Sequence, residues 1–226
     1  MIIIEEPPKP DQITSNMIIP KDSILNFLPT KNIDEKELFW FGAIISIIKM
    51  LEISYSRLFN LISTSRPNFA SEYLIIEAWS IVDNYNRLYW ILSHCPRIKK
   101  KSPWIKLMLN ELKEVENLRH FIQHYNREIE NLYVQSLPLL GYLCYAIIID
   151  SKRIRTITVI PGYVRKCTLP SINPAGKEFK MNIDLITYYI GNYTINLSKL
   201  LYKTQDFVKE FGNFISTEFP TKPLIS

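Results

Sequence analysis

The pattern of apolar and polar positions predicts two long buried helices in the first half of the chain. The stretch DEKELFWFGAIISIIKMLEISYSRLFNLIS, residues 34–63, contains no proline and is strongly apolar. Asp34 is suited to cap its start, and the acidic residues of the first turn favour a helix N-terminus. After the polar STSRPN, the stretch from Ala70 to Cys95 predicts a second helix.

A third helix is predicted over about Pro103–Tyr133, with Pro103 in its first turn, where the missing N–H costs nothing. On a helical wheel this segment has two distinct faces. The apolar face collects Val115, Leu118, Phe121, Ile122, Tyr125, Ile129 and Leu132. The polar face carries Glu116, Arg119, His120, Gln123, His124, Arg127 and Glu130. The apolar face should therefore pack on the core, and the polar face should remain available.

The composition of the chain changes after Pro138. The segments LLGYLCYAIIID and TITVIPGYV are rich in β-branched and aromatic residues and predict two strands, separated by the polar DSKRIR. Residues 167–180 read as a loop, and NIDLITYYIGNYTINLS predicts a hairpin that turns at Gly191-Asn192. A last helix is predicted over about Leu197–Phe219, with Asn196 or Ser198 as its cap.

These elements indicate a mainly α fold of the α+β class. We expect a bundle of about four long helices, with a small antiparallel β insertion at about 138–196, before the last helix. Residues 1–33 read as an irregular arm that packs onto the body at a few points, and residues 34–226 as one domain.

Composition adds only broad constraints. The 226 residues are 47% hydrophobic and 22% charged, as in ordinary globular proteins, and the net charge of +5 would suit a polyanionic partner. The three cysteines, Cys95, Cys144 and Cys167, form no CxxC pair, which is compatible with a reducing compartment. The apolar runs fall short of the roughly 20 residues that span a bilayer, so the sequence predicts a cytoplasmic protein without a membrane partner.

Candidate chemistry concentrates on the polar face of the third helix. His120 and His124 are four residues apart beside Arg119. An imidazole can carry a proton in either direction near neutral pH, and a guanidinium can hold a phosphate or stabilise an oxyanion. These are the parts needed for metal-independent phosphodiester cleavage, in which the 2′-hydroxyl of RNA is the internal nucleophile.

Two other interpretations of the histidines stay open at this point. The polar face could simply be solvated or lie against another subunit. Two imidazoles at this spacing could also share a zinc ion, with Glu116 or Glu128 extending the stripe. However, no glutamate lies between them as HExxH requires, and Arg119 and Arg127 would oppose a dication. We therefore expect neither a metal nor another cofactor.

The sequence contains two further groups of charged residues. Asp83 and Arg87 are four apart on the second helix, which favours a structural ion pair. The linker before the third helix contains Lys99, Lys100 and Lys101, which would be solvated or would contact a phosphate backbone.

The sequence from Arg119 to His124 resembles the R-x4-H motif of HEPN domains, and EAWSIVDNYNRL resembles the helix that packs before it in that family. The resemblance covers roughly residues 35–133. It implies an α-helical domain that dimerises, faces its two motif helices across a composite cleft, and cuts RNA without metal. It implies Arg119 and His124 as the catalytic pair and His120 as an assisting residue. Neighbouring cations and amides would contact RNA: Gln123, Arg127, Lys99, Lys100 and Lys101.

The same resemblance implies a toxin or defence component, with a nucleotidyltransferase antitoxin as one partner. An alternative is a non-catalytic HEPN-like module that binds a protein or a nucleotide. This alternative draws on the many apolar and aromatic residues of the chain, among them Trp40, Trp79, Trp90 and Trp104. Core packing accounts equally well for most of these residues.

Overall fold

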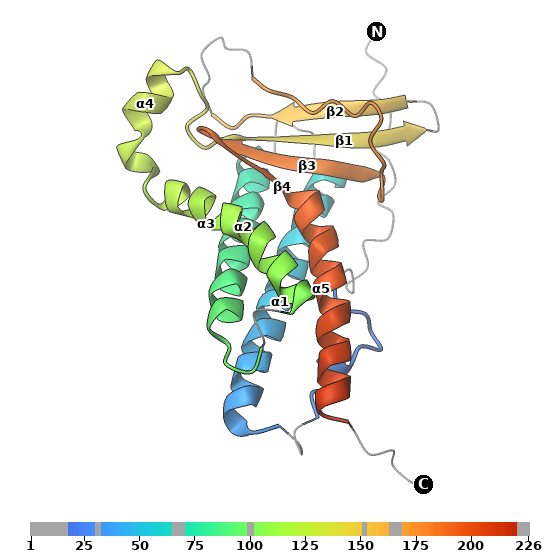
Figure 1. Ribbon diagram of the computed structural model, residues 1–226. Helices are drawn as coiled ribbons and strands as arrows, with labels where there is room; N and C mark the ends of the chain where they lie inside the picture. Colours follow the sequence, from blue (N-terminus) through green and yellow to red (C-terminus); the bar gives the residue numbers. More distant parts are fainter. Residues whose placement is uncertain are drawn as a thin grey trace.

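The computed structural model describes residues 18–29, 33–64, 71–98, 102–150, 153–162 and 169–220. This part of the chain is mostly helical and carries a small antiparallel sheet (Figure 1). The helices are α1 (Glu35–Thr64), α2 (Ser71–His94), α3 (Pro103–Gln123), α4 (Ile129–Val134) and α5 (Leu197–Glu218). The strands are β1 (Tyr142–Asp150), β2 (Arg153–Val159), β3 (Ile183–Ile190) and β4 (Tyr193–Asn196).

The long helices form a bundle, with the sheet across one end (Figure 1). The helix starts follow the capping chemistry of the sequence. The N–H of Glu37 donates to Asp34 Oδ1 at 2.7 Å, and the N–H of Lys199 donates to the side chain of Asn196 at 2.7 Å. The predictions of α1, α2 and α5 are therefore confirmed to within a residue or two.

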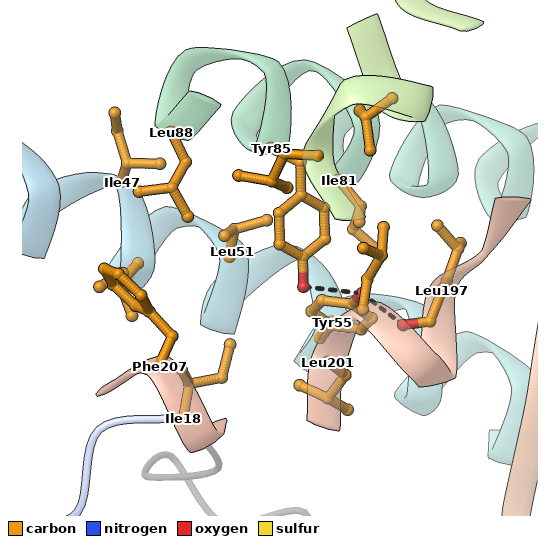
Figure 2. Packing of buried hydrophobic residues seen from close by; sticks show 14 of the residues in the cluster. Ile18, Ile47, Leu51, Tyr55, Ile81, Tyr85, Leu88, Leu197, Leu201 and Phe207 are labelled. Carbon is orange, nitrogen blue, oxygen red and sulfur yellow. Dashed lines mark hydrogen bonds between the residues drawn. The ribbon is translucent and has the colours of Figure 1, made fainter. Parts of the chain in front are cut away.

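The centre of the bundle is apolar but contains a chain of buried hydroxyls (Figure 2). Tyr55 Oη donates to the carbonyl of Leu197 at 2.7 Å and lies 3.2 Å from Tyr85 Oη. Tyr85 Oη in turn lies 2.9 Å from Thr204 Oγ1. The hydroxyls of α1, α2 and α5 thus satisfy one another where water cannot reach, which fixes the relative position of the three helices.

The sheet has the strand order β2-β1-β3-β4, with every pair antiparallel. Leu143, Tyr145 and Ile147 of β1 belong to the main core, whereas Tyr142 and Cys144 are buried outside it. Tyr142 Oη donates to the carbonyl of Pro170 at 3.2 Å, so the loop before β3 covers that second face. The β insertion is therefore buried on both faces along its central strand.

The hairpin prediction is confirmed, because β3 and β4 turn at Gly191-Asn192 with a positive φ of 54° at Gly191. The predicted boundary of the second strand is wrong. β2 begins at Arg153, so part of the polar DSKRIR belongs to the strand, where edge positions tolerate charge. Residues 163–168 of the predicted strand and loop lie outside the described residues.

The prediction of a single continuous third helix is also wrong. α3 ends at Gln123, a 3-10 turn follows over Tyr125–Arg127, and the short α4 begins at Ile129. Phe121 packs against Tyr193 of the β3–β4 hairpin, with ring centroids 5.3 Å apart. The sheet therefore contacts α3 in its last turn, where the helix ends.

α1 is long and apolar enough to cross a membrane by length and composition, with a mean hydropathy of 1.5 over its most apolar window. The whole helix is therefore longer than its uninterrupted apolar runs, which by themselves are too short to span a bilayer. Half of that window is buried inside the protein, as expected for the core helix of a globular bundle.

Candidate active site at the end of α3

The two histidines lie at the C-terminal end of α3. His120 is in the last turn of the helix, and His124 is the residue that caps it. The N–H of His124 donates to the carbonyls of His120 and Phe121, at 3.2 and 3.1 Å. The imidazole rings meet edge to face, with centroids 4.6 Å apart. The structure therefore brings the two titratable rings together.

Arg119 directly precedes this pair and makes one contact with α2 and one within α3. Its Nε lies 3.4 Å from Oδ1 of Asp83 on α2, and its Nη1 donates to the side-chain carbonyl of Gln123. About a third of the Arg119 side chain remains exposed. The guanidinium is thus oriented but still accessible.

Asp83 joins this arginine to a second one. The expected ion pair with Arg87 is present, with Nε 2.8 Å from Asp83 Oδ2. The sequence did not indicate that the other carboxylate oxygen meets Arg119, which is 36 residues away. One carboxylate thus serves two guanidiniums and leaves one positive charge uncompensated among the three, a balance that favours an anionic ligand.

A cleft of about 340 Å³ opens beside these groups, between α2 and α3. Its size is at the lower end of ligand sites and suits a unit no larger than a nucleotide. The lining combines an apolar floor with a charged rim: Ile76, Trp79, Ser80, Val82, Asp83, Arg119, Ile122 and Gln123. The sequence analysis did not identify Ile76 and Ser80, although Ile76, Ser80 and Asp83 follow one another at spacings of four and three residues and so lie on one face of α2.

The sheet holds this end of α3 in place. Trp79 Nε1 donates to Tyr188 Oη at 2.6 Å, and Tyr188 donates to the carbonyl of Leu140 at 2.8 Å. The Trp79 ring also contacts Tyr125, with centroids 6.4 Å apart. Trp79 therefore links α2 to β3 and to the segment after α3. These structural contacts are enough to explain why it lies beside the cleft.

The remaining candidate site residues from the sequence do not gather at one place. Arg127 lies exposed in the 3-10 turn after His124, and Gln123 is engaged by Arg119. Lys99, Lys100 and Lys101 lie outside the described residues. Within the parts of the chain that the structure describes, no three His, Cys, Asp or Glu side chains are grouped so that they could hold a metal ion.

No protein-family model, curated protein or solved structure matches this chain.

Proposed function

We propose that the protein is a metal-independent endoribonuclease of the HEPN type, in which two copies bring their α3 ends together over one RNA strand. One observation carries the proposal. An arginine oriented by Asp83 lines an open cleft, and two touching imidazoles follow it at the end of the same helix. This combination of groups is what phosphodiester cleavage without a metal requires.

The reaction is a transesterification within the RNA. An imidazole accepts the proton of a 2′-hydroxyl, whose oxygen attacks the adjacent phosphorus while the bond to the 5′-oxygen breaks. A protonated imidazole then gives a proton to that leaving oxygen. The products are a 2′,3′-cyclic phosphate and a free 5′-hydroxyl. His124 is the proposed proton carrier with His120 assisting, and Arg119 stabilises the charge on the phosphoryl oxygens.

The α2 surface supports an arrangement of two copies. Tyr73, Ile76 and Trp90 are 62%, 52% and 50% exposed and lie on the same side of α2 as Asp83 and Arg87. Large apolar side chains that share a face with charged ones are typical of a surface that another protein covers.

The first test is cleavage of a mixed RNA pool in EDTA by the wild type, by His124→Ala, and by Lys113→Ala as an exposed control on α3. We expect the wild type and Lys113→Ala to cut, and His124→Ala to lose activity by about 100-fold or more. A single-stranded DNA pool of the same sequences should not be cut, because it lacks the 2′-hydroxyl. Equal cleavage by His124→Ala would overturn the assignment.

A non-catalytic HEPN-like module remains the second candidate. The observation that favours it is that Arg119 already binds Asp83 and Gln123, which leaves it fewer donors for a phosphate. It predicts stable partner binding and no cleavage by the wild type. A role in toxicity or defence, with a nucleotidyltransferase antitoxin, is a proposal from the resemblance alone.

A further inference from the structure

The floor of the α2–α3 cleft is formed by apolar side chains, among them Trp79, Val82 and Ile122. Val82 is buried, and Trp79 and Ile122 are half-buried. Trp79 has one polar atom, Nε1, and this atom already donates to Tyr188 Oη at 2.6 Å. The indole ring can therefore offer a ligand only its apolar surface. A cleft of about 340 Å³ with such a floor suits a small, flat ring.

The polar rim of the cleft offers hydrogen-bond donors more than acceptors. Both carboxylate oxygens of Asp83 lie against guanidiniums, Oδ1 3.4 Å from Nε of Arg119 and Oδ2 2.8 Å from Nε of Arg87. Gln123 accepts a hydrogen bond from Arg119 Nη1 through its side-chain oxygen. Since an arginine can only donate, this bond fixes the amide and leaves its two N–H donors for a ligand. The hydroxyl of Ser80 completes the rim and can donate or accept.

An RNA base combines a flat ring with polar groups along its edge. Uracil and guanine are keto bases, which carry a carbonyl acceptor where cytosine and adenine carry an amino donor. A keto oxygen that faces the Gln123 amide accepts its N–H, whereas an amino group in that place meets a second donor and stays unpaired. The apolar floor and the donor-rich rim therefore favour a keto base.

Base pairing decides which RNA can enter the cleft. In a duplex the bases are stacked and their edges are paired, so only an unpaired base can reach a floor formed between two packed helices. Arg119 lines the cleft and directly precedes His120 in the last turn of α3. A base held in the cleft therefore belongs to a nucleotide next to the proposed point of cleavage.

We propose that the α2–α3 cleft is a base subsite that binds one unpaired keto base of single-stranded RNA, with Gln123 as the residue that selects it. This inference rests on the proposed function, to which it adds the substrate class. The floor packs against the face of the base, and the amide of Gln123 donates to its carbonyl. Arg119 keeps its remaining N–H donors for the phosphate.

Oligo-uridylate and oligo-cytidylate are the sharpest pair of probes. Their bases differ only at one edge, where uracil has a keto oxygen and cytosine has an amino group. Fluorescence anisotropy measures both dissociation constants with the His124→Ala protein, which should not cut either strand. We expect oligo-uridylate to bind about ten-fold more tightly, and hairpin stems that pair the same bases to show no such difference. Equal dissociation constants for the two single strands would overturn the proposal.

Gln123→Glu separates the contact with the base from the contact with Arg119. The carboxylate still accepts from Arg119 but has no N–H donor, so the preference for uridylate over cytidylate should disappear. The ratio of the two dissociation constants is the readout, because an added negative charge weakens the binding of any RNA. Asn117→Asp is the matched control, since it makes the same chemical change at an exposed residue of α3 outside the cleft lining. An unchanged ratio in Gln123→Glu contradicts the role of Gln123.

The base subsite and the ribonuclease can fail separately. A preference for uridylate without RNA cleavage by the wild type supports the base subsite and rejects the ribonuclease. Cleavage by the wild type, together with equal binding of the two oligonucleotides, rejects the base subsite and leaves the ribonuclease standing.

Discussion

Asp83 on α2 binds two arginines at once, with Oδ1 3.4 Å from Nε of Arg119 and Oδ2 2.8 Å from Nε of Arg87. The first contact joins α2 to α3, and the second lies within one turn of α2. The carboxylate is about one third exposed, so neither ion pair is strong in water. Its main effect is to orient Arg119, since the planar guanidinium fits a carboxylate in few geometries.

Asp83→Asn should separate orientation from stability. The amide keeps the shape but loses the charge, and the ion pairs involved are exposed. We therefore expect the free energy of unfolding to change by less than about 1 kcal/mol. The kcat for RNA cleavage should fall about ten-fold because Arg119 is less well placed, while KM should not rise, because a negative charge has left the cleft. Steady-state kinetics and urea unfolding check both parts. A rise in KM at constant kcat would contradict the orienting role.

The hairpin turn offers a way to disturb the histidines from a distance. A Cβ added at Gly191 would lie 2.8 Å from Cζ of Phe121, on a backbone with φ of 54°. Gly191→Ala should therefore lose about 1–2 kcal/mol of stability and displace Phe121, which shares the last turn of α3 with His120. Gly176→Ala is the control, because Gly176 also has a positive φ but no atom lies within 4 Å of its Cβ position.

We expect RNA cleavage to fall in Gly191→Ala but to stay normal in Gly176→Ala, with both rates measured well below the unfolding temperature. Both substitutions carry the backbone strain, so the difference between them reports the contact with Phe121. Equal cleavage rates would show that the hairpin does not position the end of α3.

Local chemistry in the sequence was enough to predict most of the helices and the hairpin. Capping by Asp34 and Asn196 and the turn at Gly191-Asn192 depend on neighbours within a few residues, and each appears in the structure. The Asp83–Arg87 pair is of the same local kind. These features need no knowledge of tertiary structure, which is why pattern and propensity identify them.

The end of α3 could not be predicted in this way. A helical wheel assumes a straight axis, and residues 125–132 continue the apolar stripe as if the helix went on. The helix stops where Tyr193, from the hairpin, lies against Phe121. The contact of Arg119 with Asp83 likewise spans 36 residues. Such long-range packing leaves no periodic trace in the sequence.

The buried tyrosines predict a loss of stability in alkali. Burial raises the pKa values of Tyr55, Tyr85 and Tyr188 well above the ordinary value, and that of Tyr145 to about 12. In the unfolded chain these phenols ionise near pH 10, so the folded state binds more protons above that pH. The stability they contribute is complete below pH 10 and is lost as pH rises.

Urea unfolding at a series of pH values should therefore show a falling midpoint above about pH 10, steepening as each phenol contributes about 1.4 kcal/mol per pH unit between its two pKa values. Tyr145→Phe is the matched variant, since it removes one phenol whose pKa is about 12. Its stability should decline less steeply between pH 10 and 12 than that of the wild type. Parallel slopes for the two proteins would contradict burial of a neutral Tyr145.

Ser136 ends α4 with a φ of 57°, a conformation that a Cβ disfavours by roughly 1–2 kcal/mol. Ser136→Gly should relieve part of this strain, offset by the greater freedom of glycine in the unfolded chain. We expect a net gain in stability of about 0.5–1 kcal/mol, confined to α4 and the turn that ends it. The backbone amides at position 136 and at Leu137 make the capping bonds, so their hydrogen exchange should slow about two- to five-fold in the variant. Faster exchange in the variant would show that these two capping hydrogen bonds do not stabilise the C-terminal end of α4.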